Sequence, residues 1–247
     1  SALVLIMIPG LALFYGGMVR AKNMVNTLWL SFIVMCIVSV QWVLWGYSLS
    51  FAPGCWFIGG LQWCGLGAGA VGQAPSDLYA TTIPHLTFMI FQCMFAIITP
   101  ALMTGTFAER FKFNAWLLLV LLWTGAVYAP VAHWVWATDG WLFKLGALDF
   151  AGGTVVHMSA GFAALAGVLV LGKRKNNEHI PTNIPFVLLG TGLLWFGWFG
   201  FNGGSALAAN TLAVSAVATT NTAAAAAGLS WLFFDVLRGK KPSVLGF

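Results

Sequence analysis

Two titratable residues, Asp149 and His157, bracket the stretch DFAGGTVVH inside strongly apolar sequence. Asp149 precedes an apolar segment, where a carboxylate can accept hydrogen bonds from the free N–H groups of a helix start and is favoured by the positive end of the helix dipole. His157 follows eight residues later, which places it about 12 Å further along a helix at ~1.5 Å per residue. An imidazole at that depth in a membrane is a candidate for a pathway that carries protons or polar solutes.

Gly153 and Gly161 lie four residues before and four residues after His157, on the same face of the predicted helix. Two interpretations are open. The glycines can let a neighbouring helix approach closely, so that His157 is a histidine hydrogen-bonded between packed helices. Alternatively, they leave room beside the imidazole, as a pathway requires. We favour the pathway, because an ionisable group near mid-membrane is costly and usually marks one.

The other polar residues do not suggest an enzyme. The four histidines are scattered rather than set at metal-ligand spacing, and the sequence contains no nucleophile–base pair and no phosphate-binding loop. His85 and His133 fall at the ends of apolar segments, so we expect them to be solvated or interfacial. We therefore predict neither catalytic residues, nor a metal site, nor a cofactor.

The elements that must position Asp149 and His157 are long apolar segments. The chain is 60% hydrophobic and 7% charged, whereas a soluble domain is about 25% charged. Runs of about 20 apolar residues can span a bilayer, and the sequence predicts a single all-α transmembrane domain over 1–247. Seven such runs are predicted, at 2–20, 24–51, 83–107, 115–136, 150–172, 184–201 and 206–237.

The basic residues predict the orientation of these runs. Ten of the eleven lysines and arginines fall in loops at alternate ends of successive runs, and Lys144 alone falls on the other side. Cytoplasmic loops carry the excess of Lys and Arg, so we expect the N-terminal end outside and the C-terminal end inside the cell. The ten basic residues are Arg20, Lys22, Arg110, Lys112, Lys173, Arg174, Lys175, Arg238, Lys240 and Lys241.

Cys55 and Cys64 lie in the predicted outer loop 53–82. Both a disulfide between them and two free thiols are possible there.

An internal repeat suggests how the helices are organised. FYGGMVRAKN (14–23) aligns without gaps with FNGGSALAAN (201–210), and five of the ten positions are identical. The two copies fall at opposite sides of the predicted membrane, which is the signature of an inverted-topology repeat. We therefore expect a complete first repeat of five helices and a second repeat of which only two helices are present, as in a fragment of a longer chain.

Long motifs carry a family resemblance. IPGLALFYGGMVRAKN, LDFAGGTVVHMSAGFAALAG and LLWFGWFGFNGGSALAANT resemble the ammonium transporter (Amt/Mep/Rh) family on its Amt side, and FQCMFAIIT and YAPVAHWVW agree. The resemblance covers nearly the whole chain. It implies eleven helices in two inverted five-helix repeats plus a last helix, a homotrimer, and a pore for ammonium or ammonia through each subunit.

Matched motif by motif, the resemblance also implies site residues. The family's outer recruitment site corresponds to Trp136, Phe95 and Ser205, and its stacked phenylalanine gate to Phe95 and Phe201. His157 corresponds to the first pore histidine, and Asp149 to a structural or recognition acid behind the entrance. The family's second pore histidine has no intramembrane counterpart after His157 in this sequence.

Two functions remain open on the sequence. The first is ammonium transport in a plasma or inner membrane, with a cation attracted to aromatic faces. The second is an Amt-like membrane sensor that controls an attached or partner signalling domain. The resemblance also implies regulation by a PII-type protein at the cytoplasmic mouth. The excess of basic residues is explained by membrane topology, so we predict no nucleic-acid partner.

Overall fold

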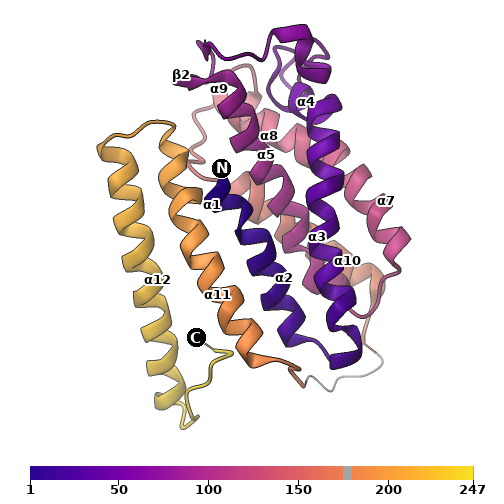
Figure 1. Cartoon of the computed structure of the whole chain (residues 1–247), viewed down its shortest axis with the longest axis vertical. Coiled ribbons are helices and arrows are strands. Elements are labelled where there is room, and N and C mark those ends of the chain that lie inside the picture. Colours follow the sequence, from indigo (N-terminus) through magenta and orange to yellow (C-terminus); the bar gives the residue numbers. More distant parts are fainter. Residues whose placement is uncertain (175–179, 247) are drawn as a thin grey trace.

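The computed structural model describes residues 1–174 and 180–246, so that Lys175 lies outside the described part. The helices of the chain run roughly along one axis (Figure 1). Two short strands, β1 (Pro75–Ser76) and β2 (Ala80–Pro84), pair antiparallel. The α-helices are α1 (Ala2–Leu5), α2 (Met7–Met18), α3 (Met24–Gln41), α4 (Tyr47–Phe51), α5 (His85–Leu102), α6 (Thr104–Phe107), α7 (Phe113–Trp123), α8 (Ala129–Trp136), α9 (Trp141–Lys144), α10 (Ser159–Leu171), α11 (Ile184–Trp198) and α12 (Thr211–Leu237). The short 3-10 segments are η1 (Ala21–Asn23), η3 (Cys64–Gly69) and η7 (Gly204–Ala206), and the π-helical turns are η2 (Trp42–Gly46), η4 (Thr124–Tyr128), η5 (Gly153–Met158) and η6 (Phe199–Gly203).

The helices are long enough to make this chain a polytopic membrane protein. Within the described residues, six helical segments have the length and apolar composition to cross a membrane, and the N-terminal apolar helix Ala2–Met18 is shorter. The apolar runs of the sequence thus correspond to six full-length segments and one shorter helix. The last helix begins at Thr211 rather than at 206, because the Asn210 side chain caps it by accepting a hydrogen bond from the Ala213 N–H at 3.0 Å.

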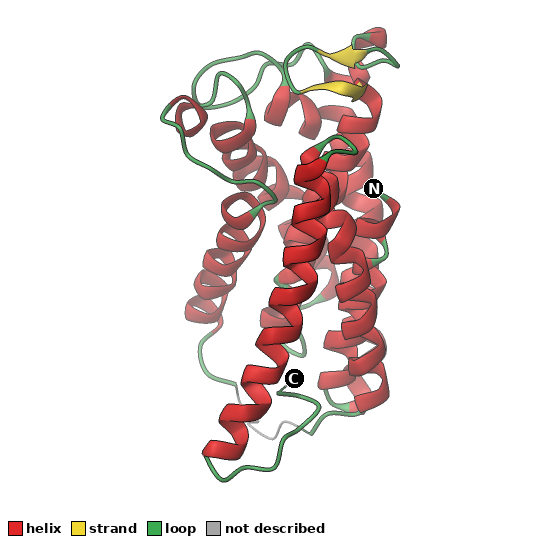
Figure 2. Cartoon of the chain, turned by 90° about the vertical axis from the view of Figure 1, so that its left-hand side faces the viewer, coloured by secondary structure: helices red, strands yellow, loops and turns green. Residues whose placement is uncertain are grey.

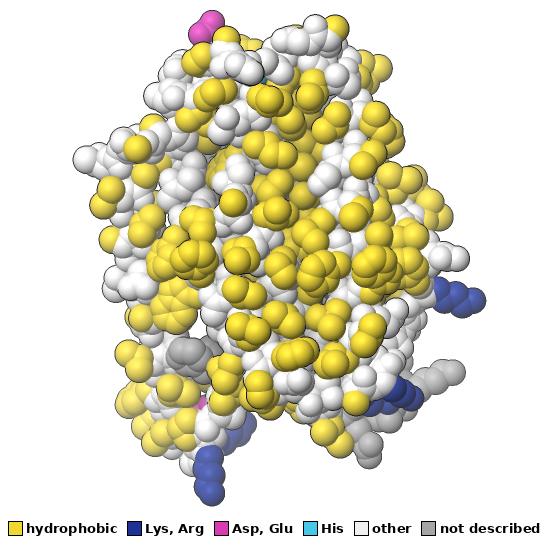
Figure 3. Space-filling model, viewed as in Figure 1, with side chains coloured by type: hydrophobic (Ala, Val, Ile, Leu, Met, Phe, Trp, Pro, Cys, Tyr) yellow, Lys and Arg dark blue, Asp and Glu magenta, His cyan; other side chains and the backbone are white. Residues whose placement is uncertain are grey.

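Charge and secondary structure divide the molecule into two ends. The strands lie beyond the helices at one end (Figure 2), and α9, which carries Lys144, lies at the same end (Figure 1). Lys and Arg side chains gather toward the opposite end of the face seen in Figure 3, and apolar side chains fill its middle. This arrangement agrees with the alternation of basic loops along the sequence.

α5 is the central helix. Its side chains are buried along most of its length, and Phe88, Phe95 and Ile98 belong to the main hydrophobic core. Pro84 precedes its first residue, where a proline is tolerated. Pro100 lies inside the last turn, and the helix ends two residues later before α6 continues at Thr104. The two prolines therefore mark the start of this helix and its interruption.

α2 and α11 cross closely because glycines line their contact. A Cβ atom on Gly190 would lie 2.5 Å from the Gly10 carbonyl oxygen, and one on Gly17 would lie 2.5 Å from the Asn183 carbonyl oxygen. Neither position admits a side chain without moving a backbone, as in other membrane helix pairs that meet through small residues. These helices carry the first and second copies of the repeated motif at or just beyond their C-terminal ends.

Two histidines are buried, contrary to the expectation that they are solvated. His85 is 5% exposed and His133 is fully buried. The Tyr47 hydroxyl lies 2.6 Å from His85 Nε2, and the two ring nitrogens of His133 lie 3.1 Å and 2.8 Å from the carbonyl oxygens of Ser50 and Cys55. The folded outer segment covers both rings, which an apolar run alone does not reveal. Cys55 and Cys64 are free thiols.

Candidate functional site

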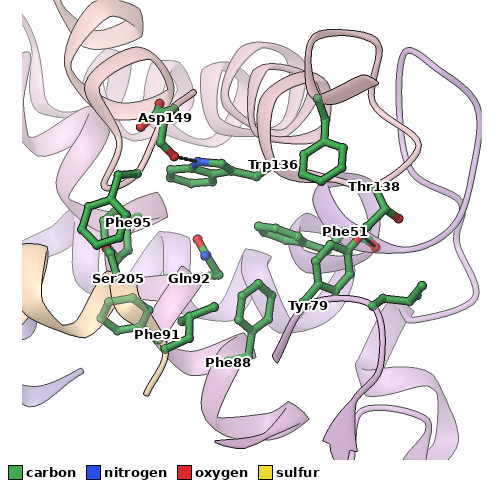
Figure 4. Close-up of a pocket in the computed structure, with 14 residues that line it drawn as sticks. Phe51, Tyr79, Phe88, Phe91, Gln92, Phe95, Trp136, Thr138, Asp149 and Ser205 are labelled. Carbon is green, nitrogen blue, oxygen red and sulfur yellow. Dashed lines mark hydrogen bonds between the residues drawn. The ribbon is translucent and has the colours of Figure 1, made fainter. Parts of the chain in front are cut away.

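An aromatic cavity of about 250 Å³ opens at the end of the molecule that carries the strands. Trp136 comes from the end of α8, Phe88, Phe91 and Phe95 from α5, and Tyr79 from the segment just before β2 (Figure 4). Asp149 and Ser205 also line it. Three residues that the sequence assigned to one recruitment site, Trp136, Phe95 and Ser205, therefore lie around a common cavity.

Asp149 supports the start of the next helix. One carboxylate oxygen accepts hydrogen bonds from the Gly152 and Gly153 N–H groups at 2.5 Å and 2.9 Å, and the other from Thr154 and Val155 at 2.8 Å and 2.9 Å. The helix begins at Gly153, so the acid satisfies N–H groups that a helix start leaves unpaired. The contacts expected of a cap are present, and both oxygens take part.

The backbone at Gly152 makes this geometry possible. Gly152 has a φ of +95°, in the left-handed region, and a Cβ atom there would lie 2.7 Å from Val156 Cγ2. A side chain at this position is excluded both by backbone strain and by space. The chain can therefore turn beneath Asp149 and present successive N–H groups to its carboxylate.

Trp136 is held in place by the same segment. Its indole N–H donates a hydrogen bond to the Asp149 carbonyl oxygen at 2.9 Å, and its ring meets the Phe95 ring edge to face at 5.8 Å (Figure 4). Because its only polar hydrogen is committed, the indole presents an apolar π face to the cavity. Such a face attracts cations.

Two phenylalanines pack against each other beside the cavity, and Phe95 lines it. The ring centroids of Phe95 and Phe201 are 4.5 Å apart at an angle of 45°, and each residue is 1% exposed. Phe95 lies on α5, and Phe201 lies in the π-helical turn η6 that follows α11. The two rings therefore form a contact between helices that are far apart in the sequence.

His157 lies on the other side of Phe201. Their ring centroids are 5.9 Å apart, and the imidazole stacks on the Trp198 indole with centroids 5.8 Å apart at 9°. Within the described chain neither imidazole nitrogen has a hydrogen-bond partner, and a Cβ atom on Gly153 or Gly161 would meet nothing within 4 Å. No described residue therefore packs tightly against these glycines, and both interpretations of their spacing remain predictions.

Several residues of this arrangement carried no signal in the sequence analysis. Nothing in the sequence distinguished Trp198 from the other twelve of its thirteen tryptophans, and Tyr79 was one residue of a long predicted loop. Gln92 also lines the cavity; its spacing from Phe88, Phe91 and Phe95, at i, i+3, i+4 and i+7, could have revealed it. His157 and Phe201 both occupy π-helical turns, which are frequent at functional sites. Regular helical periodicity does not predict such turns.

The opposite end of the molecule holds an ion-pair network that was also not expected. Glu109 Oε1 accepts hydrogen bonds from Arg20 Nε at 3.0 Å and from Asn23 Nδ2 at 2.8 Å, and Arg174 Nη1 lies 3.5 Å from its other oxygen. Burial raises the pKa of Glu109, but the hydrogen bonds from Arg20 and Asn23 outweigh burial and lower the pKa to about 2. The network joins three loops at the end where the basic residues gather.

Replacing Glu109 with glutamine is expected to destabilise the protein by on the order of 2 kcal/mol at neutral pH, since a carboxylate with depressed pKa stabilises its folded state. That contribution is complete above the ordinary pKa of 4.5 and is lost as the pH falls toward about 2. Melting temperatures of the full-length protein in detergent, taken between pH 7 and pH 3, test this. The wild type should lose stability on acidification more steeply than Glu109→Gln, and parallel curves would contradict the assignment.

The helices and the cavity define a polytopic, mostly helical membrane protein with an aromatic cavity at one end and a half-buried histidine near it. A model of the Ammonium Transporter Family matches residues 1–247, and the chain belongs to that family.

Individual proteins agree with this assignment. The chain is 54% identical over 247 residues to an ammonium transporter of Bacillus subtilis and 50% identical over 250 residues to the ammonium transporter Amt1 of Archaeoglobus fulgidus; in each case the match takes in 100% of this chain and 60% of the relative. The crystal structure of Candida albicans Mep2 superposes with a TM-score of 0.91 at 43% identity, over 100% of this chain and 55% of that one. A structure titled "Sensor Amt Protein" matches with a TM-score of 0.87 at 30% identity, over 99% of this chain and 62% of that one. The chain thus spans about 60% of the length of the curated relatives it matches.

Proposed function

We propose that the complete protein transports ammonium or ammonia across a membrane through a pore in each subunit. The observation that supports this proposal is a succession of ring contacts: Phe95 lines the aromatic cavity, Phe201 contacts Phe95, and His157 contacts Phe201. Each group has a chemical task that suits a small cation. The family of the chain and the names of its relatives support the same substrate.

In this proposal the cavity recruits the cation. The faces of Trp136 and Phe95 attract a positive charge without binding it as tightly as a carboxylate would. Ser205 donates its hydroxyl hydrogen to the Phe201 carbonyl oxygen at 2.8 Å, so the lone pairs of its oxygen remain to accept a hydrogen bond from the ammonium ion. The Asp149 carboxylate acts on the cavity indirectly, because its oxygens are occupied by four N–H groups.

Beyond the cavity, the Phe95–Phe201 pair acts as a gate. Two apolar rings offer no ligands to a hydrated metal ion, whose dehydration is then not compensated. An ammonium ion can transfer a proton to water at the outer mouth and pass as neutral ammonia. His157, next along the path, exchanges hydrogen bonds or protons with it.

Uptake of radiolabelled methylammonium by liposomes that contain the full-length protein tests the function. The expected result is saturable uptake that ammonium inhibits competitively and that potassium at the same concentration does not. Empty liposomes, and liposomes with an unrelated membrane protein, are the controls. Uptake indistinguishable from these controls would rule out the proposed transport.

Opening the gate should change selectivity. Phe201→Ala is expected to alter methylammonium uptake at least about threefold and to reduce discrimination against potassium, because a cavity replaces one of the two rings. Leu118→Ala is the matched control, since Leu118 is 57% exposed on α7. Uptake and potassium-induced current are the measurements. Equal behaviour of Phe201→Ala and Leu118→Ala would remove Phe201 from the transport path.

A sensor is the second candidate, and the structural match to a protein titled "Sensor Amt Protein" is the observation that favours it. A sensor binds ammonium in the same cavity and passes a conformational change to a signalling domain. Binding of ammonium without uptake, in the liposome experiment above, would favour the sensor over the transporter.

The assembly and location follow from the same proposal. We infer a homotrimer, with a second five-helix repeat that completes each pore, in the plasma or inner membrane. The N-terminal end of this chain faces outward and the basic end faces the cytoplasm. A PII-type signalling protein would meet that cytoplasmic face, where Arg20 and Arg174 surround Glu109.

A further inference from the structure

One face of α5 forms a wall of the aromatic cavity. Phe88, Phe91, Gln92 and Phe95 occupy positions i, i+3, i+4 and i+7 of this helix, so that they share one side. Gln92 is the only polar member of the four, and it is 8% exposed. In Figure 4 its amide points into the cavity between Phe95 and Trp136.

The Gln92 amide oxygen is buried and has no hydrogen-bond donor. Leaving a buried acceptor unpaired costs free energy, so its neighbours would be expected to satisfy it. Three other donors around this cavity are committed elsewhere, so that none of them reaches this oxygen. Trp136 Nε1 donates to the Asp149 carbonyl, Ser205 Oγ to the Phe201 carbonyl, and the Tyr79 hydroxyl to the Phe51 carbonyl.

An unpaired acceptor whose neighbouring indole and hydroxyl donors are committed suits a ligand that donates hydrogen bonds. An ammonium ion has four N–H groups and no acceptor, and primary alkylammonium ions have three. The terminal torsion of a glutamine side chain is broad, so the amide can turn its oxygen toward the cavity without moving α5. The surrounding rings attract any cation. A carbonyl oxygen additionally stabilises a cation that donates an N–H hydrogen bond to it.

We propose that Gln92 is a further binding residue of this cavity, whose amide oxygen accepts a hydrogen bond from an ammonium or alkylammonium ion. The inference rests on the proposed transport of ammonium and adds to it a directional contact. The aromatic rings supply attraction, and Gln92 supplies preference for cations that carry N–H groups.

Gln92→Met tests this in the full-length protein, because methionine has nearly the same length and shape but only a weak acceptor. The half-saturation concentration for methylammonium uptake should rise about tenfold, as expected for the loss of one hydrogen bond to a charged group, while the maximal rate stays near that of the wild type. Gln92→Glu keeps an acceptor and should restore half-saturation to the wild-type value or below.

Gln41→Met is the matched control. Gln41 is also a buried glutamine, 2% exposed, but it lies on α3 and donates to the Leu121 carbonyl at 3.0 Å. This variant should leave half-saturation unchanged. The same half-saturation in Gln92→Met and the wild type would overturn the assignment, and absence of saturable uptake in the wild type itself would instead overturn the proposed transport.

Thermal stability provides a readout that separates binding from packing. Without ammonium, Gln92→Met should melt no earlier than the wild type, because it removes an unpaired buried acceptor. Adding ammonium chloride should raise the melting temperature of the wild type more than that of Gln92→Met. Earlier melting of Gln92→Met without ammonium, with an unchanged response to the salt, would show that Gln92 serves packing and would contradict the proposal.

Discussion

Replacing His157 with alanine is expected to reduce methylammonium uptake by about 100-fold or more, the lower end of what a positioned proton-transfer group contributes. A neutral imidazole offers one donor and one acceptor, and here no described protein group occupies either nitrogen. The ring can therefore accept a hydrogen bond from ammonium, relay a proton, or donate to ammonia. Alanine removes every one of these possibilities at the point where the proposed path leaves Phe201.

Two further variants make this expectation specific. His157→Phe keeps a ring that can stack on Trp198, in place of the 5.8 Å contact of the imidazole, but it has no nitrogen. If transport requires the imidazole nitrogens, His157→Phe should reduce uptake as much as His157→Ala does. Met158→Ala is the control, because Met158 is the next residue along and is 52% exposed. Uptake is measured alongside the yield of folded protein after detergent extraction. Normal uptake and unchanged ion selectivity in His157→Phe would mean that His157 is only a packing residue.

Replacing Asp149 with alanine is expected to destabilise the protein by at least about 3 kcal/mol, because four N–H groups lose a charged acceptor. Assembly and uptake should fall together. The carboxylate anchors the helix that carries His157, and the adjacent carbonyl holds Trp136. Yield of assembled protein, melting temperature and uptake are the measurements. A variant that assembles fully but does not transport would indicate that Asp149 contacts the substrate directly.

Asp149→Asn is the informative second variant. Asparagine caps helices well, so on the sequence alone it would separate geometry from charge. The structure changes that expectation, since each carboxylate oxygen accepts two N–H groups. Asparagine keeps one oxygen and places an NH₂ group opposite the other two donors. We therefore expect an intermediate loss of both stability and uptake, and wild-type stability in Asp149→Asn would contradict the four-bond geometry.

Asp149 and His157 are linked structurally, because both belong to the short segment around η5. Asp149 fixes the first N–H groups of η5, and His157 lies near the end of the same π-helical turn. A shift of the turn would move the imidazole relative to Phe201 and Trp198. The acid that the sequence marked as a cap therefore also determines the position of the histidine.

The sequence by itself determined the class of the protein. Apolar runs of this length have no alternative to helices in a bilayer, because an unpaired backbone group is too costly there. The alternation of basic residues determined which loops share an end of the molecule, and Lys144 indeed lies on α9, at the end opposite to the basic loops. Cap chemistry at Asp149 was also predicted from the sequence, since it depends on neighbours within a few residues, whereas the cap at Asn210 was not predicted.

Contacts between distant segments were decided only by the tertiary structure. The family motifs pointed to Phe95 and Phe201, but more than one hundred residues separate them in the sequence, and periodicity cannot bring their rings together. Arg20 and Glu109 are 89 residues apart, and the burial of His133 depends on a folded outer segment that supplies two carbonyl groups.

The π-helical turns and the unpaired amide of Gln92 were also decided only by the tertiary structure. A π-helical turn shifts every following side chain relative to a regular helix, so the direction in which His157 and Phe201 point is fixed by packing and not by spacing. Whether a buried glutamine is paired depends on which donors its neighbours have already used. Local sequence contains the residues for each of these features, but a hydrogen bond or a ring contact forms only where the folded chain leaves a partner within reach.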